Sequence, residues 1–379
     1  MLTALLLLIF IRPFICSLSF PDLNFVYLMV LVSVLSSWVG IKGLSTKGPR
    51  ATAAWLAVLA VLAYSIFLSD ANASAIEKLL QHIAEIMLLL VCRSMSRQDT
   101  DRLIRTLVAA GLLVALMGIY QYLFVLPRTL ATHPVDSLAP SMTLDYIRQK
   151  RVNYPLLTPN VLGSYLIMLF PLAFALRKRP LIIATPLLVT LLLTQSLGAL
   201  GSMLVALLIY YSSLGKLTRL SMLLLFGAGA AILVLYHLRA ATDSQCFQPI
   251  FSSAMRLSYW QQTWQIIQAH PWTGIGMGNF DLYNSRYSHN ACLQIWAETG
   301  IFGLAAFLGA SLGILKTGWD SVRHAGDKTA AALLCAASAF FLHNLVDFTF
   351  FLPETSLIWF AILGILWNRG VEPGHRADR

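Results

Sequence analysis

The sequence predicts an all-α polytopic integral membrane protein, because its composition, hydropathy and apolar spacing agree. Of its 379 residues, 58% are hydrophobic and 12% are charged, and its mean hydropathy is +0.71. Soluble domains carry about 25% charged residues. Apolar runs of about 20 residues, the length of a bilayer-spanning helix, recur from end to end of the chain. A water-soluble enzyme is therefore excluded.

The apolar runs predict about twelve transmembrane helices in a single membrane domain, residues 1–379. Their expected bounds are 1–20, 24–41, 51–68, 71–92, 103–126, 156–176, 180–195, 197–213, 218–236, 289–315, 328–350 and 353–368. The first span is expected to break near Arg12-Pro13. With both termini in the cytoplasm, segments 127–155 and 237–288 become the two long outer loops. Only these loops are large enough to build a site outside the bilayer.

The net charge of +10 reflects topology and not a nucleic-acid partner. Most of the 27 Lys and Arg residues fall in the loops predicted to be cytoplasmic, which is the positive-inside pattern. Cations against this bias lie in the two outer loops, and they are Arg128, Arg148, Lys150, Arg151, Arg239, Arg256 and Arg286. These residues need another reason, and an anionic ligand would supply one.

The larger outer loop contains a predicted amphipathic helix, RLSYWQQTWQIIQAHPW, over residues 256–272. Trp260, Trp264 and Ile267 share one side, as in helices that lie in the membrane interface. Pro271 is expected to end this helix, and TGIGMGNF (273–280) reads as a glycine-rich turn. A helix that merely covers the bundle explains the tryptophans, but it does not explain Arg256 at its start.

The next segment, YSHNACLQIWAETG (287–300), predicts a helix that begins near His289 and opens a membrane span. Gly300 falls on the same face as His289, where it would admit a neighbouring helix. Asn290 begins a separate polar stripe that ends at Glu298, about 180° from His289. His289 and Glu298 therefore cannot pair within this helix. Hydrogen bonding to neighbouring helices would explain the histidine, but ionisable groups at membrane depth favour function.

Two further segments carry candidate site residues. In RVNYPLLTPNVLGSYL (151–166), Thr158 and Pro159 predict a helix N-terminus, and Asn160 follows in its first turn. Such a terminus attracts anions, and Arg148, Lys150 and Arg151 precede it. Capping alone would not call for three cations.

In FFLHNLVDFTF (340–350), His343 and Asp347 are spaced i, i+4 and are expected to share a helix face. They would either hold two helices in register or take part in function, with Asp347 orienting His289 or another polar group.

A polar patch in the fourth predicted span supports a different function. Glu77, Lys78, His82 and Glu85 lie within nine residues of each other, where pairs can form along one helix. A proton-coupled transporter or flippase would use such a patch and would need no histidine in an outer loop. A non-catalytic scaffold of an envelope assembly is a third alternative.

The combination of PWTGIGMGNF, SHNACLQIWAETGIFGLAAF and HNLVDFTFFLPE resembles the O-antigen ligase and O-antigen polymerase superfamily. RVNYPLLTPNVLGSYLIMLFPL and LLLTQSLGALGSMLVALL are similar to weaker motifs of that family. The resemblance covers residues 100–368, with its specific core at 271–303. It implies a bacterial inner-membrane enzyme with about twelve spans and an active site that faces the periplasm.

The resemblance also implies the chemistry of the substrates. Donors would be glycans on undecaprenyl diphosphate, and acceptors would be lipid A–core for a ligase or another glycan unit for a polymerase. Neither a metal nor any other cofactor is implied. The protein is expected to be embedded in the lipid bilayer, and no nucleic-acid partner is expected.

The family's functional residues carry over to individual positions. Its essential histidine corresponds to His289, the arginine that opens the amphipathic helix to Arg256, and the arginine before the Pro-Asn motif to Arg151. The family often has Ser-Arg-Gly after the Thr-x of TQSLG, whereas here Leu197 follows Ser196. The residues expected to support the site are Arg148, Lys150, Asn160, Arg286, Asn290 and Asp347. Either Arg148, Lys150 or Arg286 replaces the missing arginine, or the chain is a divergent branch of the family.

Overall fold

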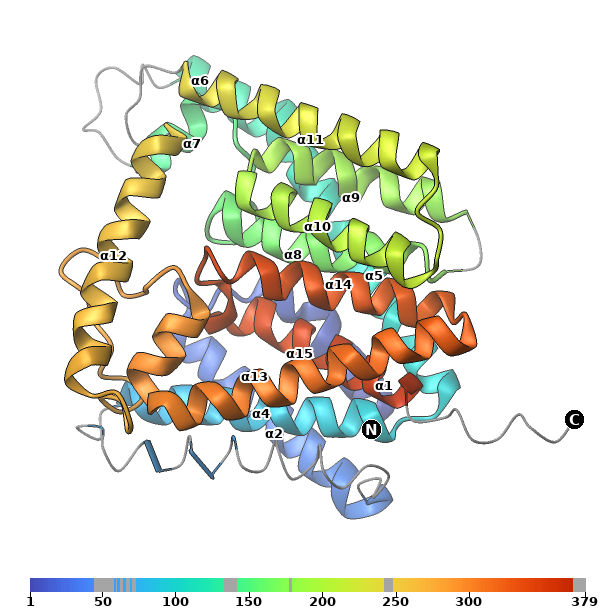
Figure 1. Cartoon of the computed structure of the whole chain (residues 1–379), viewed down its shortest axis with the longest axis vertical. Coiled ribbons are helices and arrows are strands. Elements are labelled where there is room, and N and C mark those ends of the chain that lie inside the picture. Colours follow the sequence, from blue (N-terminus) through green and yellow to red (C-terminus); the bar gives the residue numbers. More distant parts are fainter. Residues whose placement is uncertain are drawn as a thin grey trace, which may run out of the picture.

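The computed structural model describes residues 1–43, 58, 60–61, 64–65, 69, 73–132, 142–176, 179–241 and 248–370. Within these residues every regular element is a helix, which confirms the all-α prediction. The elements, labelled in Figure 1, are α1 (Leu2–Ile11), η1 (Arg12–Phe14), α2 (Pro21–Lys42), α4 (Ala73–Ser94), α5 (Arg97–Tyr120), η2 (Gln121–Val125), α6 (Leu126–Thr132), α7 (Met142–Arg148), α8 (Pro159–Ala173), α9 (Pro180–Thr194), α10 (Leu197–Ser213), α11 (Arg219–Ala240), α12 (Pro249–Ala269), α13 (Ala291–Ala325), α14 (Lys328–His343), η5 (Thr349–Phe351) and α15 (Pro353–Gly370).

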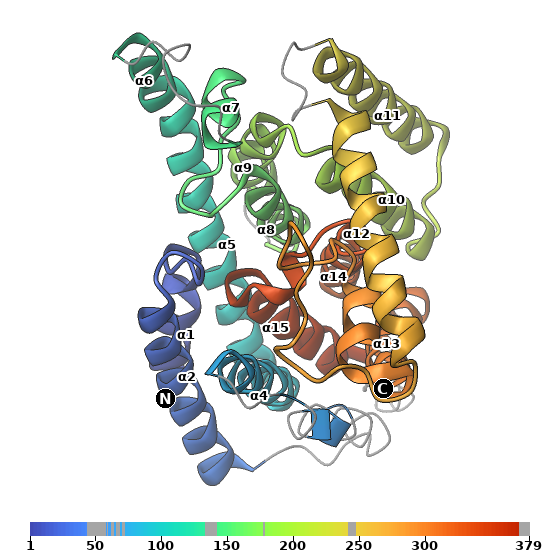
Figure 2. The ribbon, with the colours of Figure 1, turned by 90° about the vertical axis from the view of Figure 1, so that its left-hand side faces the viewer.

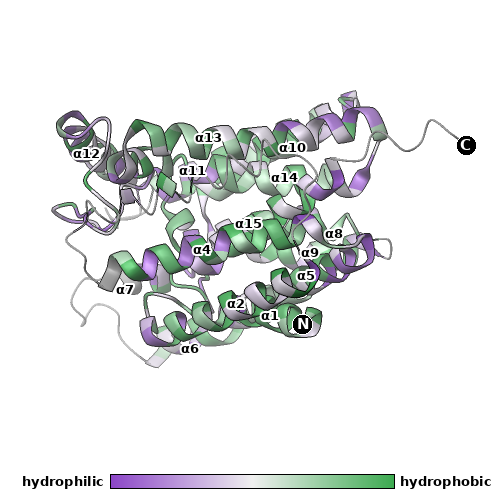
Figure 3. Ribbon diagram, turned by 90° about the horizontal axis from the view of Figure 1, so that it is seen from below, coloured by the Kyte–Doolittle hydropathy of each residue, from purple (hydrophilic) through white to green (hydrophobic). Residues whose placement is uncertain are grey.

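Four helices of the described chain are long and apolar enough to cross a membrane. They are Pro21–Lys42, Arg97–Thr132, Ser221–Ala240 and Ala291–Ala325. Shorter apolar helices accompany them, and hydrophilic residues gather towards both ends of the helices (Figure 3). The protein is therefore a helical membrane protein. The count of about twelve spans stays a prediction, and most of the span expected at 51–68 lies outside the described residues.

The first predicted span breaks where Arg12-Pro13 predicts it, because α1 ends at Ile11 and the chain continues as a 3-10 turn. The Arg12 side chain is fully buried and its Nη2 lies 3.1 Å from Oε2 of Glu354, which is also fully buried. A buried cation needs such a partner to offset its lost hydration. This ion pair joins the N-terminal segment to the start of α15.

Helix α13 is interrupted at Gly300, where φ is 71° and ψ is −177°. This conformation is essentially restricted to glycine, and a Cβ here would overlap the Trp272 carbonyl. The prediction that Gly300 admits a neighbouring helix is therefore wrong, because a loop backbone occupies that space. The amide of Gly276 donates to the Glu298 carbonyl at 3.1 Å, so the predicted glycine-rich turn, with Gly274, Gly276 and Gly278 all at positive φ, satisfies groups that the kink frees.

Helix α12 lies across the ends of the bundle helices and not parallel to them (Figures 1 and 2). It packs against α13 and α11. Ile267 is buried while Trp264 is exposed, so only part of the predicted tryptophan side faces protein. The helix begins at Pro249 and not at Arg256 as predicted, because Pro249 occupies the first helical position, where a missing N–H costs nothing. Arg256 thus lies two turns inside the helix.

Candidate active site

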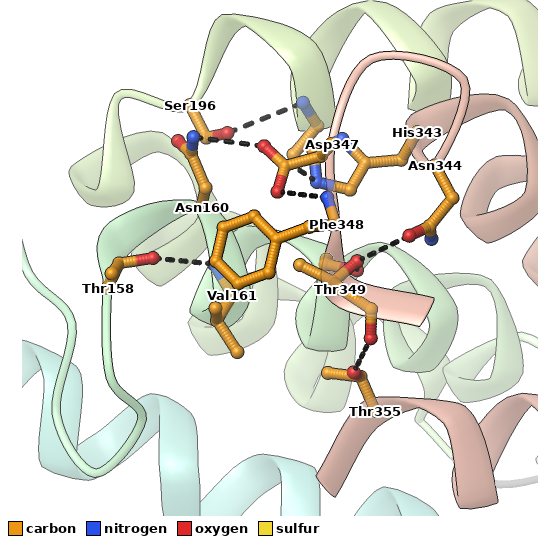
Figure 4. A network of polar contacts seen from close by, with 12 residues as sticks. Thr158, Asn160, Val161, Ser196, His343, Asn344, Asp347, Phe348, Thr349 and Thr355 are labelled. Atoms are coloured by element: carbon orange, nitrogen blue, oxygen red, sulfur yellow. Dashed lines mark hydrogen bonds and ion pairs between the residues drawn. The ribbon is translucent and has the colours of Figure 1, made fainter. Parts of the chain in front are cut away.

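Asp347 is the centre of a polar network between three segments of the fold, and Figure 4 shows its contacts with Asn160 and Phe348. Its side chain is 1% exposed. Oδ2 accepts a hydrogen bond from Asn160 Nδ2 at 3.1 Å and one from Arg256 Nη2 at 3.4 Å. Oδ1 accepts from the backbone N–H of Phe348 at 2.8 Å. One carboxylate therefore joins the start of α8, the middle of α12 and the loop after α14.

The prediction that His343 and Asp347 share a helix face is wrong, because α14 ends at His343. Asn344 ends the helix, and its Oδ1 accepts from the Phe350 amide at 2.6 Å and from Thr349 Oγ1 at 3.1 Å. These bonds form the following loop. His343 Nε2 still lies 3.9 Å from Asp347 Oδ2, which is ion-pair distance and not hydrogen-bond distance.

The pKa of Asp347 lies below its ordinary value although burial alone would raise it. Electrostatic interactions with His343, His289 and Arg256 lower the pKa, and the bond from the Phe348 amide adds to this effect. Asp347 is therefore a carboxylate at neutral pH. It provides the negative charge that the surrounding cationic side chains face.

Arg151 is a buried cation in the segment between α7 and α8. Its side chain is 4% exposed, Nε donates to the Thr194 carbonyl at 2.9 Å and Nη2 donates to Asn160 Oδ1 at 3.4 Å. Burial lowers its pKa to about 9, with further lowering by the charges of Arg239 and Arg256. It remains protonated at neutral pH. An anion bound beside Arg151 would offset both the cost of burying its charge and the repulsion from the other arginines.

The predicted helix N-terminus at Thr158-Pro159-Asn160 is confirmed. Thr158 caps α8 by accepting from the Val161 amide at 3.3 Å, and Pro159 occupies the first helical position. Asn160 Oδ1 accepts from Arg151 while its Nδ2 donates to Asp347. Asn160 therefore holds the cation and the carboxylate in fixed relative positions.

Arg256 reaches Asp347 from α12, and its guanidinium is held from two sides. Nη1 donates to Ser252 Oγ at 2.7 Å, one turn earlier in the helix, and Nη2 donates to Asp347. The side chain is 22% exposed. The ion pair is thus accessible to a ligand, unlike the buried pair between Arg12 and Glu354.

His289 lies in a loop and not on α13, which corrects the predicted helix start. The helix begins at Ala291 with Asn290 as its cap, and His289 has φ 56°. Ser288 Oγ donates to the Asn290 carbonyl at 2.6 Å, and the Ser288 amide donates to Gln294 Oε1 at 3.1 Å. These bonds support a left-handed conformation that histidine adopts more readily than most residues.

Aromatic side chains surround the His289 ring. Tyr259 of α12 stacks on it with ring centroids 5.5 Å apart, and Phe348 meets it edge-on at 4.8 Å. Nδ1 is buried and has no hydrogen-bond partner among the described residues. Burial lowers the His289 pKa, Asp347 partly offsets this effect and Arg256 reinforces it. His289 is therefore a neutral imidazole at neutral pH, as a proton acceptor must be.

The remaining candidates lie at the edge of this network or have structural partners. Arg148 and Arg286 are exposed, and Arg148 Nη1 is 3.9 Å from Asp145 Oδ1. Lys150 is exposed in a turn with φ 50°. Asn290 caps α13 by accepting from the Leu293 amide at 3.1 Å. None of the contacts described for these four residues reaches Asp347.

The polar patch that suggested a transporter is paired within the fold. Glu77 accepts from Asn24 Nδ2 at 2.8 Å, Lys78 Nζ lies 3.2 Å from Glu298 Oε1, and His82 Nδ1 lies 2.7 Å from Glu85 Oε2. The first two contacts join α4 to α2 and α13, and the third lies within α4. The patch therefore has a packing role, and Glu298 is engaged there and not with His289.

Arg239 is a further cation beside the site that the sequence analysis did not predict as a site residue. The sequence marks it only as one of the outer-loop cations that depart from the positive-inside pattern. Arg239 lies near the end of α11, is 9% exposed and donates from Nη1 to the Gln195 carbonyl at 3.2 Å. Its charge acts on Arg151.

The network combines three arginines, one carboxylate and a neutral histidine. Such a site is suited to binding a multiply charged anion beside a proton acceptor. Among the described residues, no group of three or more His, Cys, Asp and Glu side chains could hold a metal ion.

Comparison with known proteins agrees with the motifs. A search of curated proteins finds no match for this chain. A family model described as O-antigen ligase matches residues 182–308, about a third of the chain. The matched segment runs from α9 into α13 and includes Arg239, Arg256 and His289. This segment of the chain is therefore similar to the O-antigen ligase family.

Proposed function

We propose that the protein is a glycosyltransferase that moves a glycan from undecaprenyl diphosphate to an acceptor hydroxyl at the periplasmic face of the bacterial inner membrane. The favoured acceptor is lipid A–core, which would make the protein an O-antigen ligase. The observation that carries the proposal is the convergence of Arg151, Arg256 and His289 around Asp347 from separate segments of the chain.

The arginines are assigned to the leaving group. When the bond between the anomeric carbon and the diphosphate oxygen breaks, undecaprenyl diphosphate leaves with the bonding electrons. Its developing charge needs cations already in place. Arg256 is held by Ser252 and Asp347, and Arg151 by Thr194 and Asn160. Guanidinium groups bind phosphate oxygens with paired N–H donors and remain charged.

His289 is assigned to the acceptor. Its neutral imidazole takes the proton of the acceptor hydroxyl while the hydroxyl oxygen forms the new bond to the anomeric carbon. Asp347 stabilises the imidazolium that results, since its charge already raises the His289 pKa against the effect of burial. Attack opposite the diphosphate would invert the anomeric centre.

An O-antigen or exopolysaccharide polymerase is the alternative within the same superfamily. It would use the same donor end, and therefore the same arginines and histidine, but a second glycan unit as acceptor. The chemistry of the site does not distinguish these acceptors, because both present a sugar hydroxyl. The outcome depends on the surface that receives the acceptor.

Reconstitution of transfer tests the proposal. The purified full-length protein is incubated with an undecaprenyl-diphosphate-linked glycan and either lipid A–core or additional donor, and the products are analysed by mass. A glycan on lipid A–core identifies a ligase, and a lengthened lipid-linked glycan identifies a polymerase. Movement of the substrate across the membrane without a new glycosidic bond would refute both.

The variants His289→Ala and His289→Asn test the base. We expect both to abolish transfer at normal membrane abundance. Asparagine adopts the left-handed conformation readily, so His289→Asn separates the loss of the imidazole from a change in the loop. Full transfer by either variant would remove His289 from the mechanism.

A further inference from the structure

A pocket of about 660 Å³ lies at the end of the helix bundle opposite the candidate active site. Its walls come from α5, the residues that follow α8, the first turn of α9, the start of α14 and the end of α15. The lining residues are Asp101, Ile104, Arg105, Ala175, Leu176, Ile183, Thr329 and Arg369. The pocket therefore collects both charged and apolar side chains from five segments of the chain.

The pocket is separate from the site around Asp347. Helix α14 begins at the pocket and ends shortly before Asp347, and its 16 residues span about 24 Å at about 1.5 Å per residue. The turn between α13 and α14 lies on the opposite side of the molecule from α12 (Figure 1). The segments before α5, between α8 and α9 and between α13 and α14 are all loops that the sequence predicts to be cytoplasmic. The pocket is thus expected at the cytoplasmic interface of the membrane.

Arg369 is a fixed part of the pocket wall. Its side chain is 8% exposed, Nη2 donates to Asp101 Oδ1 at 2.8 Å and Nη1 donates to Asp327 Oδ2 at 3.2 Å. Arg97 Nη1 lies 3.6 Å from the same oxygen of Asp327. Two arginines therefore face two aspartates, and the charges of this group balance.

Arg105 adds a positive charge that this group does not balance. It lies one turn after Asp101 on α5, lines the pocket and is exposed. Its side chain has no hydrogen bond or ion pair with any of the residues that the structure describes. The positive-inside pattern explains a cation at this end of α5, but it does not explain why the cation borders a pocket with apolar walls.

The apolar walls continue onto the outer surface of the bundle. Ile104 is buried, and Leu176 and Ile183 are half-buried in the pocket. Beside Ile183, at the start of α9, Leu181 is 68% exposed and Ile182 is 64% exposed. A small soluble anion would contact only the polar part of this surface. A lipid has an anionic headgroup for the arginine and acyl chains for the apolar side chains, and basic pockets between membrane helices bind such headgroups.

We infer that this pocket binds an anionic phospholipid, with Arg105 bonded to the phosphate and an acyl chain lying along Leu176, Ile183 and the start of α9. The single unbalanced charge matches the single negative charge of a phosphodiester headgroup. Arg369 shapes the pocket and is already engaged by Asp101 and Asp327. The inference does not depend on the proposed function, because it concerns the other end of the bundle.

Native mass spectrometry of the purified full-length protein in detergent tests the inference. The probes are phosphatidylglycerol, which carries one negative charge, and phosphatidylcholine, which is neutral overall. We expect saturable binding of one phosphatidylglycerol molecule, roughly fivefold tighter than that of phosphatidylcholine, which is the effect of one basic residue near an anionic lipid. Arg105→Gln should remove this preference. Arg105→Lys should retain most of it, because lysine binds phosphate as a point charge.

Two further variants separate the pocket from the general charge of the surface. Arg102→Gln is the matched control, because Arg102 is an exposed arginine of the same helix, lies outside the pocket lining and has its Nη1 3.6 Å from Asp99 Oδ1. Its affinity for phosphatidylglycerol should equal that of the unmodified protein. Ile183→Trp keeps every charge but fills the pocket, so it should weaken the binding of phosphatidylglycerol.

Four results would overturn the inference. Equal affinities for the two lipids would show that the pocket does not select an anion. Equal losses in Arg105→Gln and Arg102→Gln would show an effect of surface charge. Unchanged binding by Ile183→Trp would place the lipid elsewhere. Displacement of phosphatidylglycerol by an equal concentration of glycerol phosphate would identify a soluble anion, and not a lipid, as the ligand.

Discussion

Replacement of Arg256 offers the sharpest test of the proposed diphosphate site, because the structure shows which of its donors the protein already uses. Nη1 bonds to Ser252 Oγ and Nη2 bonds to Asp347 Oδ2. A guanidinium has five N–H donors, so both terminal nitrogens retain a further donor for a ligand. Lysine at this position would keep the charge but lose the planar fork.

The magnitude follows from the bonds at stake. Hydrogen bonds to charged groups contribute about 1.5–3 kcal/mol each. Two such bonds from Arg256 to the diphosphate would contribute about 3–6 kcal/mol, which corresponds to roughly 10²- to 10⁴-fold in rate at about 1.4 kcal/mol per factor of ten. Arg256→Ala should lose that much kcat/KM for the donor. Arg256→Lys should lose less, roughly 10- to 100-fold.

The assay is the reconstituted transfer reaction with the donor concentration varied. Ser252→Ala removes one protein partner of the guanidinium and leaves the charge, so its kcat/KM should fall only a few-fold. Arg219→Ala serves as the control for an exposed arginine outside the site, at the start of α11. Arg256→Ala within threefold of the unmodified protein, or a loss of the same size in Arg219→Ala, would refute the reasoning.

Two further predictions concern the pH profile and the kink. Because burial lowers the pKa of His289, kcat/KM should fall only below pH 6.5, the ordinary histidine value. Asp347 raises the His289 pKa, so Asp347→Asn should move this fall in kcat/KM to still lower pH. A fall at the same or a higher pH in Asp347→Asn would contradict the interaction between Asp347 and His289. Gly300→Ala should lower the melting temperature in detergent, since backbone strain at its φ of 71° costs more than about 1 kcal/mol and the Trp272 carbonyl blocks a Cβ. Gly309→Ala in the same helix should not lower the melting temperature, because its Cβ would meet open space. Equal melting temperatures for the two variants would show that the kink relaxes.

The sequence alone predicts the helical membrane fold and several of its details. Hydropathy is a local property, so runs of apolar residues report helices without knowledge of their neighbours. Local chemistry also predicts the break after Ile11, the cap at Thr158 and the glycine-rich turn after Pro271. The cations of the outer loops predict an anionic ligand, because topology alone does not explain them.

Only the tertiary structure determines where the helices around the site begin and which side chains meet. The start of α13 after His289 depends on a bond from the Ala291 amide to the distant Asn344 carbonyl, at 2.8 Å. The meeting of Arg256 and Asp347 depends on α12 lying across the bundle ends. Arg239 comes near Arg151 through the packing of α11. These contacts join residues tens of positions apart, and the periodicity of a single segment carries no information about them.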